Sequence, residues 1–254
     1  MLPDWFVAGL PALPDFVVLA TVSLLAGVMR GFAGFGSGLL MAPVFSLVLS
    51  PTDTLAVILL LHVLTVFQIL PAALRTVDWG LVLRLLVPAL LGVPLGLFMV
   101  HSLDAALMRK TVGLVVIVVA LLMLRGWYYA GRRGRVQDTV AGALSGFMTA
   151  ISGIGGPPLV LYLLSDRSVT PVIFRSVMIV FFFFTQMATL VPFTLSGSLS
   201  LYQTVFVVLL LPVFVLATQL GSVLHRYAAQ KHQALARRVC LVFLLVTGAL
   251  ALLV

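Results

Sequence analysis

Charged side chains are scarce in this sequence: Asp, Glu, Lys and Arg together make up only 9% of its 254 residues. Because a soluble domain usually carries about 25% of such residues, this chain could not cover a surface that faces water. Hydrophobic residues make up 62% of the chain, and the mean hydropathy is +1.25. The composition therefore predicts an integral membrane protein whose surroundings are the lipid bilayer.

Cysteine is almost absent, and signals of other protein classes are missing as well. The single cysteine, Cys240, excludes an intramolecular disulfide and a CxxC metal site. The net charge of +8 arises from arginines in short loops, without the basic, aromatic-rich face that nucleic-acid binding requires. Residues 1–16 lack the basic region of a cleaved signal peptide. We therefore expect no bound nucleic acid, metal or cofactor.

Long apolar runs dominate what remains, and a membrane-spanning helix needs about 20 such residues. The long runs form two groups of three, and a shorter, interrupted apolar run precedes each group. The first interrupted run is 16–50, with its interruption at 31–38, and the second is 138–165, with its interruption at 152–158. The arms beside each interruption have about 10 to 15 residues, which is short for a full span. The pattern predicts two glycine-broken helical hairpins, each followed by three transmembrane helices. The six long runs are 54–74, 81–101, 106–125, 170–194, 201–224 and 237–254.

The two halves of the chain are related in sequence. Residues 27–44, "GVMRGFAGFGSGLLMAPV", align without a gap with residues 146–163, "GFMTAISGIGGPPLVLYL". We predict a first repeat over 1–125, a basic cytoplasmic linker over 126–137 and a second repeat over 138–254. The paired positions include Gly27 with Gly146, Gly34 with Gly153, Gly36 with Gly155, Gln68 with Gln186, Pro88 with Pro212 and Gly96 with Gly221.

Loop charges predict how the repeats are oriented. The segments 125–135 and 225–238 are rich in arginine, so the positive-inside rule assigns both to the cytoplasm. Counting helices from there places the basic loop 74–80 inside and its uncharged equivalent, 196–200, outside. The best fit is an all-α polytopic membrane protein of two inverted-topology repeats, with about eight to ten segments and both termini outside. Inverted repeats with broken helices are typical of secondary transporters.

The two breaks carry the chemistry of a binding site. Glycine-rich turns expose successive N–H groups, and the following helix adds positive potential at its N-terminus, which together favour an anion. Arg30 precedes the first break, and a charge at membrane depth is a functional candidate. The predicted binding residues are Arg30, Gly34, Gly36, Ser37, Gly38, Gln68, Ser152, Gly153, Gly155, Gly156, Pro157 and Gln186, and the candidates for coupling or gating are His62, Tyr162 and Arg175.

Several of these residues also have structural interpretations. Gly27 and Gly31 have the spacing of close helix packing, and Arg30 could bind carbonyl groups that the break leaves free. Gln68 and Gln186 could equally join helices. His62 could be a packing histidine, Tyr162 an interfacial aromatic residue and Arg175 a side chain reaching toward the interface. The run "VFFFF" at 180–184 is expected to face lipid.

A serine nucleophile is the strongest enzymatic alternative, because it would need only a histidine base within reach. Ser37 and His62 are both present, but "FGSG" is not the pattern of a known intramembrane nucleophile. We therefore expect no catalytic residues and no enzyme.

The motifs "GFAGFGSGLLMAPVF" and "AISGIGGPPLVLY" resemble those of the sulfite exporter TauE/SafE family of membrane permeases. Ser37 stands where that family often has another glycine. The resemblance implies a carrier for sulfite, sulfonates or related organosulfur anions in the bacterial cytoplasmic membrane. An anion channel, or a transporter of another small anion such as a carboxylate, is the alternative. H⁺ or Na⁺ could be the coupling ion, and either a monomer or a homodimer fits the sequence.

Overall fold

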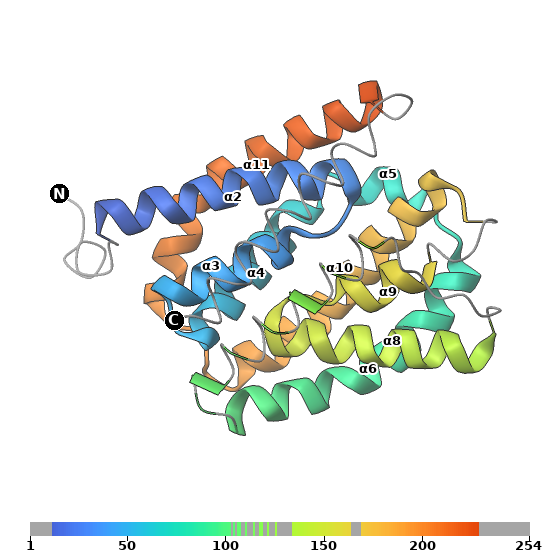
Figure 1. Cartoon of the computed structure of the whole chain (residues 1–254), viewed down its shortest axis with the longest axis horizontal. Coiled ribbons are helices and arrows are strands. Elements are labelled where there is room, and N and C mark those ends of the chain that lie inside the picture. Colours follow the sequence, from blue (N-terminus) through green and yellow to red (C-terminus); the bar gives the residue numbers. More distant parts are fainter. Residues whose placement is uncertain are drawn as a thin grey trace.

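The computed structural model describes residues 12–102, 134–163 and 169–228, with scattered positions between 104 and 125. The expected span 237–254, most of 106–125, most of the linker, both chain ends and Cys240 lie outside the described residues. Every regular element in the described part is an α-helix, as expected (Figure 1). The helices are α2 (Leu13–Ala33), α3 (Ser37–Val48), α4 (Pro51–Val66), α5 (Leu70–Leu74), α6 (Trp79–Ser102), α8 (Arg135–Ser152), α9 (Gly156–Leu163), α10 (Pro171–Leu195) and α11 (Leu201–Ala228).

Four of these helices are long and apolar enough to cross a membrane: Leu13–Ala33, Trp79–Val100, Val172–Leu195 and Leu201–His225. Their outward faces expose large apolar side chains, among them Leu91 at 77% and Leu195 at 82%. Such exposure is costly in water but suits contact with lipid. The chain is therefore a multi-pass membrane protein.

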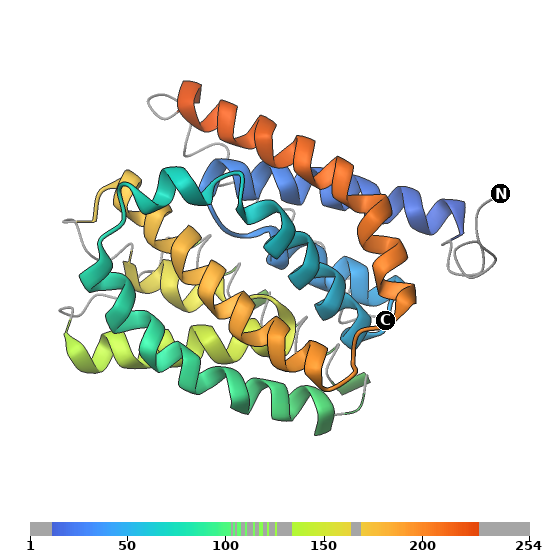
Figure 2. The ribbon, with the colours of Figure 1, turned by 180° about the vertical axis from the view of Figure 1, so that it is seen from behind.

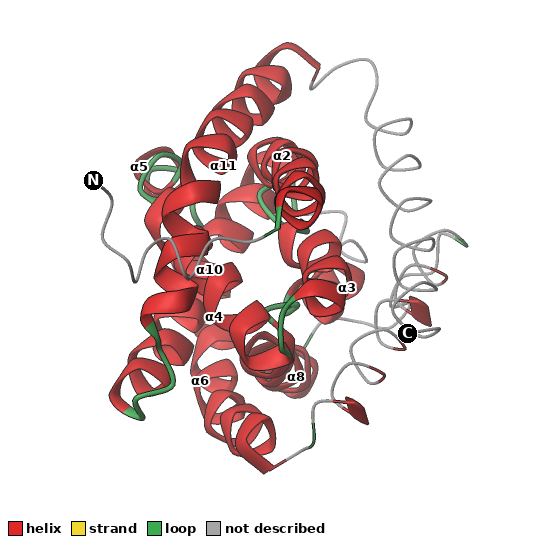
Figure 3. Ribbon diagram, turned by 90° about the vertical axis from the view of Figure 1, so that its left-hand side faces the viewer, coloured by secondary structure: helices red, strands yellow, loops and turns green. Residues whose placement is uncertain are grey.

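The two broken hairpins enter the bundle from opposite ends. In Figure 1, α2 runs from left to right and α3 turns back to the left, whereas α8 runs from right to left and α9 turns back to the right. The reverse view shows α4 and α10 crossing the middle of the bundle in opposite directions (Figure 2). Several helices are seen nearly end-on in Figure 3. Both glycine-rich breaks consequently lie inside the bundle.

The hairpins have arms of unequal length, which differs from the expected arms of about 10 to 15 residues. In the first hairpin α2 has 21 residues and α3 has 12, and in the second α8 has 18 and α9 has 8. Only the second arm of each hairpin is clearly too short to cross a bilayer.

The single helix expected over 54–74 is interrupted. Helix α4 ends at Val66, and α5 begins at Leu70 with Pro71 in its first turn. Pro71 has no N–H to donate to the carbonyl of Phe67, so an unbroken helix would lose a hydrogen bond there.

The two long arms end in the same way. Gly34 and Gly153 both adopt left-handed backbone, with φ of 81° and 71°. Each comes directly after the last residue of its helix, α2 or α8. Their N–H groups donate to the carbonyls of Arg30 and Thr149, each at 2.8 Å. This termination needs glycine because side chains disfavour positive φ. The predicted equivalence of the two breaks therefore extends to their backbone hydrogen bonds.

Small residues let two helix pairs approach closely. Helix α2 packs against α11, and α6 packs against α8. A methyl group on Gly27 would lie 2.6 Å from the Cβ of Ala217, and one on Gly31 would overlap the backbone of Thr218. Gly221 lies equally close to the backbone of α2. The close-packing interpretation of Gly27 and Gly31 is therefore correct.

Replacing Gly31 by Leu should lower the free energy of unfolding by about 1–3 kcal/mol, because the new side chain would force α2 and α11 apart. Thermal unfolding in detergent measures this loss. Gly80→Ala is the matched control, since a methyl group there meets only the side chains of Asp78 and Arg84, at 3.3 and 3.9 Å. Equal melting temperatures for Gly31→Leu and the unmodified protein would contradict the close packing.

Candidate functional site

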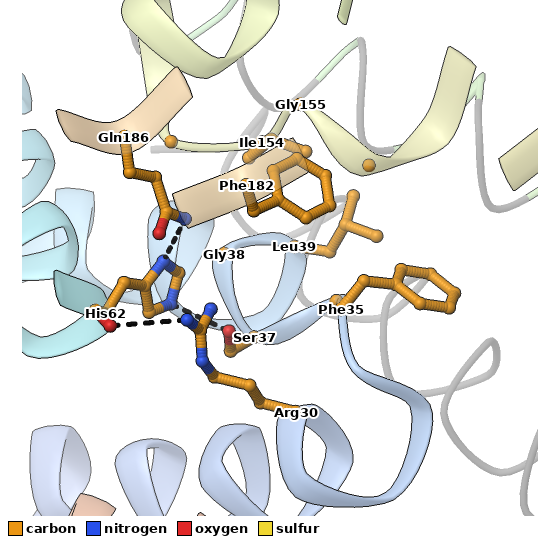
Figure 4. A pocket seen from close by; sticks show the side chains of 13 residues that line it. Arg30, Phe35, Ser37, Gly38, Leu39, His62, Ile154, Gly155, Phe182 and Gln186 are labelled. Carbon is orange, nitrogen blue, oxygen red and sulfur yellow. Dashed lines mark hydrogen bonds between the residues drawn. The ribbon is translucent and has the colours of Figure 1, made fainter. Parts of the chain in front are cut away.

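A small cavity of about 20 Å³ lies where the two breaks meet. That is room for about one water molecule. Figure 4 shows side chains from both hairpins, α4 and α10 converging on it. It is lined by Arg30, Phe35, Gly36, Ser37, Gly38, Leu39, His62, Gly153, Ile154, Gly155, Gly156, Phe182 and Gln186.

The tips of the hairpins touch through their backbones. A methyl group on Gly38 would overlap the carbonyl of Gly153, and one on Gly156 would lie 3.3 Å from the ring of Phe35. Helices α3 and α9 both begin at this contact, at Ser37 and Gly156. The first N–H groups of a helix have no partner within it, so the tips direct positive potential at the cavity.

The two helix starts differ in how many donors they offer. Pro157 and Pro158 occupy the first turn of α9 and supply no N–H group. At the start of α3 the Leu39 N–H donates to the Gly36 carbonyl at 3.0 Å, but Ser37 and Gly38 also have N–H groups. The first hairpin therefore has the greater capacity to bind an anion through its backbone.

Four buried polar residues form one connected cluster, which we call the His62 network: Arg30, Ser37, His62 and Gln186. The imidazole Nε2 of His62 lies 2.7 Å from Ser37 Oγ, and Gln186 Nε2 donates to His62 Nδ1 at 2.8 Å. Arg30 Nη2 donates to the backbone carbonyl of His62 at 3.3 Å (Figure 4). The network joins α2, α3, α4 and α10 around the cavity.

Two polar atoms of the His62 network have no hydrogen-bond partner among the described residues: Arg30 Nε and Gln186 Oε1. Arg30 is 3% exposed and Gln186 is 2% exposed. Leaving such groups unpaired in a low-dielectric interior is costly. An unpaired donor on a cation beside the cavity favours a ligand that carries negative charge.

The cavity carries positive charge that no carboxylate among its described lining residues balances. None of the described residues that line it is acidic. Asp53 instead accepts hydrogen bonds from Ser50 and Gln203, and Asp138 forms an ion pair with Arg84 at 3.1 Å. A charge buried without a counter-ion is expensive, which supports a functional role for Arg30.

Ser37 and His62 are close enough to be a nucleophile and its base, so their surroundings matter. In a catalytic triad the histidine Nδ1–H is held by an acceptor, usually a carboxylate. Here Gln186 donates to Nδ1, so the ring proton is on Nε2 and points at Ser37. In this arrangement Nε2 donates to Ser37, and none of the described residues that line the cavity supplies the carboxylate of a triad.

The remaining predicted residues lie outside the cavity lining. Gln68 is exposed in the turn between α4 and α5. Ser152 donates to its own helix at the Met148 carbonyl, at 3.0 Å. Tyr162 donates to Asp138 at 2.6 Å. Gly34 and Pro157 are close to the tips but do not line the cavity.

Arg175 also lies away from the cavity and has a clear structural role. Its Nη2 donates to the Gly31 carbonyl at 2.9 Å, and its side chain lies against Gly34. A cation at the C-terminal end of a helix satisfies free carbonyls and the helix dipole. Arg175 therefore caps α2 at the break.

Four apolar lining residues escaped the sequence analysis. Phe35 and Ile154 occupy equivalent positions of the aligned breaks, so the repeat itself held the signal. Leu39 follows the first break. Phe182 belongs to the run expected to face lipid, but it is 5% exposed, and only Phe184 of that run is exposed. Successive residues of an α-helix point to different sides of the helix, so five consecutive residues cannot all face lipid.

Comparison with known proteins identifies the family of the chain. A family model described as sulfite exporter TauE/SafE matches residues 19–251. A protein of Cupriavidus necator strain H16, described as a probable sulfite/organosulfonate exporter TauE, is 29% identical over 222 residues, which cover 85% of each chain. No solved structure matches. The match extends over nearly the whole chain, including both breaks, and the chain belongs to the sulfite exporter TauE/SafE family of membrane transporters.

Proposed function

We propose that this chain is a secondary transporter that carries a small sulfite-type or organosulfonate anion across the bacterial cytoplasmic membrane. The anion binds between the tips of the two hairpins. The proposal depends on the buried residue Arg30, which lines the cavity between the tips. Its Nε has no hydrogen-bond partner in the described part of the chain.

The donors around the cavity suit an oxyanion. Arg30 supplies charge and N–H groups, and guanidinium groups bind planar or trigonal oxygen sets well. Ser37 supplies a hydroxyl, and the start of α3 supplies backbone N–H groups. Gln186 presents an amide. Phe35, Leu39, Ile154 and Phe182 form an apolar side of the cavity that accommodates a short organic group.

Alternating access between two inverted repeats, 1–125 and 138–254, is the mechanism we propose. The equivalent hairpins α2–α3 and α8–α9 enter from opposite ends (Figure 1). Each long arm packs against the other half of the chain, α2 on α11 and α8 on α6. Because the cavity holds about one water molecule, the tips must separate to admit an anion. The basic segments then face the cytoplasm, with both termini outside.

Purified protein in liposomes should accumulate radiolabelled sulfite or methanesulfonate by counterflow against the same unlabelled anion. Counterflow requires a saturable carrier, so a channel would give flux without it. Sulfate and acetate serve as competitors of different charge and shape. Absence of counterflow with all four anions would contradict the proposed function.

Arg30→Ala should weaken anion affinity by about ten- to a hundredfold, because a charge-assisted bond contributes about 1.5–3 kcal/mol. Arg175→Ala removes the same charge from the cap of α2 and should weaken affinity much less. Competition of counterflow by increasing anion concentration gives both affinities. The reverse order would move the site toward Arg175.

Gly155→Val should abolish counterflow while leaving membrane insertion intact. A branched side chain there would overlap the Thr149 hydroxyl and lie 3.0 Å from the ring of Phe182, and so would displace the second tip. Size-exclusion chromatography in detergent checks the folding of the variant. Gly80→Ala is again the control, and normal flux through Gly155→Val would argue against the tips as the site.

A further inference from the structure

We infer that His62 binds a proton together with the transported anion, so that the carrier moves the two in the same direction. This inference rests on the proposed anion site, because the anion supplies the negative charge that the proton requires. The coupling ion is H⁺, and His62 Nδ1 is the atom that holds it.

Both side-chain partners of His62 can change their hydrogen-bonding role. Ser37 Oγ can donate or accept, and the Gln186 amide has a donor nitrogen and an acceptor oxygen. A histidine held by two such groups can exist as neutral imidazole or as imidazolium without losing a partner. A histidine held only by fixed donors or fixed acceptors would lack this freedom.

The hydrogen bonds show what proton uptake would change. In the structure Gln186 Nε2 donates to His62 Nδ1, and the ring donates from Nε2 to Ser37 Oγ. A proton added at Nδ1 turns that atom into a donor. The Gln186 amide then rotates to present Oε1, which has no partner among the described residues. The bond to Ser37 is unchanged, and the Ser37 hydroxyl remains free to donate to the anion.

A third side chain favours the charged ring. Phe214 of α11 stacks on the imidazole of His62, with ring centroids 5.8 Å apart and an interplanar angle of 28°. The face of an aromatic ring attracts a cation. The protonated histidine would therefore have an acceptor at each nitrogen and an aromatic face above it.

Arg30 makes this proton depend on the anion. It is part of the same buried cluster, and two positive charges there repel each other strongly in a low dielectric. An anion bound to Arg30 removes that repulsion. By linkage, the anion must favour the proton by the same factor as the proton favours the anion.

The other charged or titratable groups on the helices around α4 contact residues outside the His62 network. On α10, Arg175 caps α2. On α11, His225 packs edge-on against Phe32, with centroids 5.7 Å apart. On α8, Asp138 pairs with Arg84 of α6. Asp53, on α4 itself, binds Gln203. Among the described residues, Arg30 is therefore the charge that faces the His62 network.

Methanesulfonate tests the inference because its charge does not change with pH in the neutral range. In liposomes with a trapped pH-sensitive dye, an inward methanesulfonate gradient should acidify the interior. Its affinity should fall by up to about tenfold per pH unit across the pH range in which His62 loses its proton. Loss of counterflow in the unmodified protein would overturn the proposed function and this inference together.

His62→Gln should lose both the acidification and the pH dependence of methanesulfonate affinity, whatever rate of counterflow it retains, because glutamine can hydrogen-bond Ser37 but cannot take up a proton. His225→Gln is the matched control and should retain both. Gln186→Leu offers a second route if His62→Gln does not fold, since it removes the acceptor for the Nδ1 proton and should flatten the same pH dependence. Counterflow with unchanged acidification in either His62→Gln or Gln186→Leu would overturn the inference alone.

Discussion

Backbone groups that leave a helix inside a membrane must find new partners, and this constraint shapes the whole molecule. The chain breaks two helices in its interior and satisfies them locally, through the N–H groups of Gly34 and Gly153. Side chains bind further backbone carbonyls near the breaks: Arg175 donates to the Gly31 carbonyl, and Ser145 donates to the carbonyl of Gly155. Broken backbone at this depth persists only where protein or a polar cavity surrounds it. The two breaks therefore had to be buried against each other, and the cavity lies between them.

Much of the fold followed from periodicity and composition because the bilayer leaves few choices. Apolar runs of fixed length predicted the helices, and clustered glycines predicted both breaks to within a few residues. The error at 54–74 has a local cause, since Pro71 ends a helix that hydropathy alone would continue. The first arm of each hairpin was underestimated, in α8 because polar residues such as Arg135 and Gln137 extend the helix beyond its apolar part. Hydropathy identifies what lies in lipid and says less about where a helix begins.

The candidate site was harder to predict, because contacts between distant helices leave little trace in one sequence. The tip glycines were identified through the repeat, and Arg30 through its charge. The alignment paired Gln68 with Gln186, but the α4–α5 turn places Gln68 on the surface, whereas Gln186 contacts His62 across 124 positions. The chain carries no pattern that links Ser37, His62 and Gln186. Their proximity results from the packing of α3, α4 and α10, which only the three-dimensional structure reveals.

The two halves are alike in backbone but unlike in chemistry at the break. Arg30 and Thr149 are equivalent positions, and both carbonyls accept the glycine N–H that ends the helix. The Thr149 hydroxyl donates to the Ser145 carbonyl at 2.8 Å and stays within its own hairpin. Arg30 instead reaches across to α4 and borders the cavity. The first hairpin thus contributes charge, a hydroxyl and backbone donors, while the second contributes glycines, two prolines and Ile154. In the proposed carrier the anion is bound mainly by the first repeat, and the second acts as the wall against which it is enclosed. The two hairpins thus enter from opposite ends with matching backbone at their breaks, and in the proposed carrier their different side chains select the sign of the transported charge.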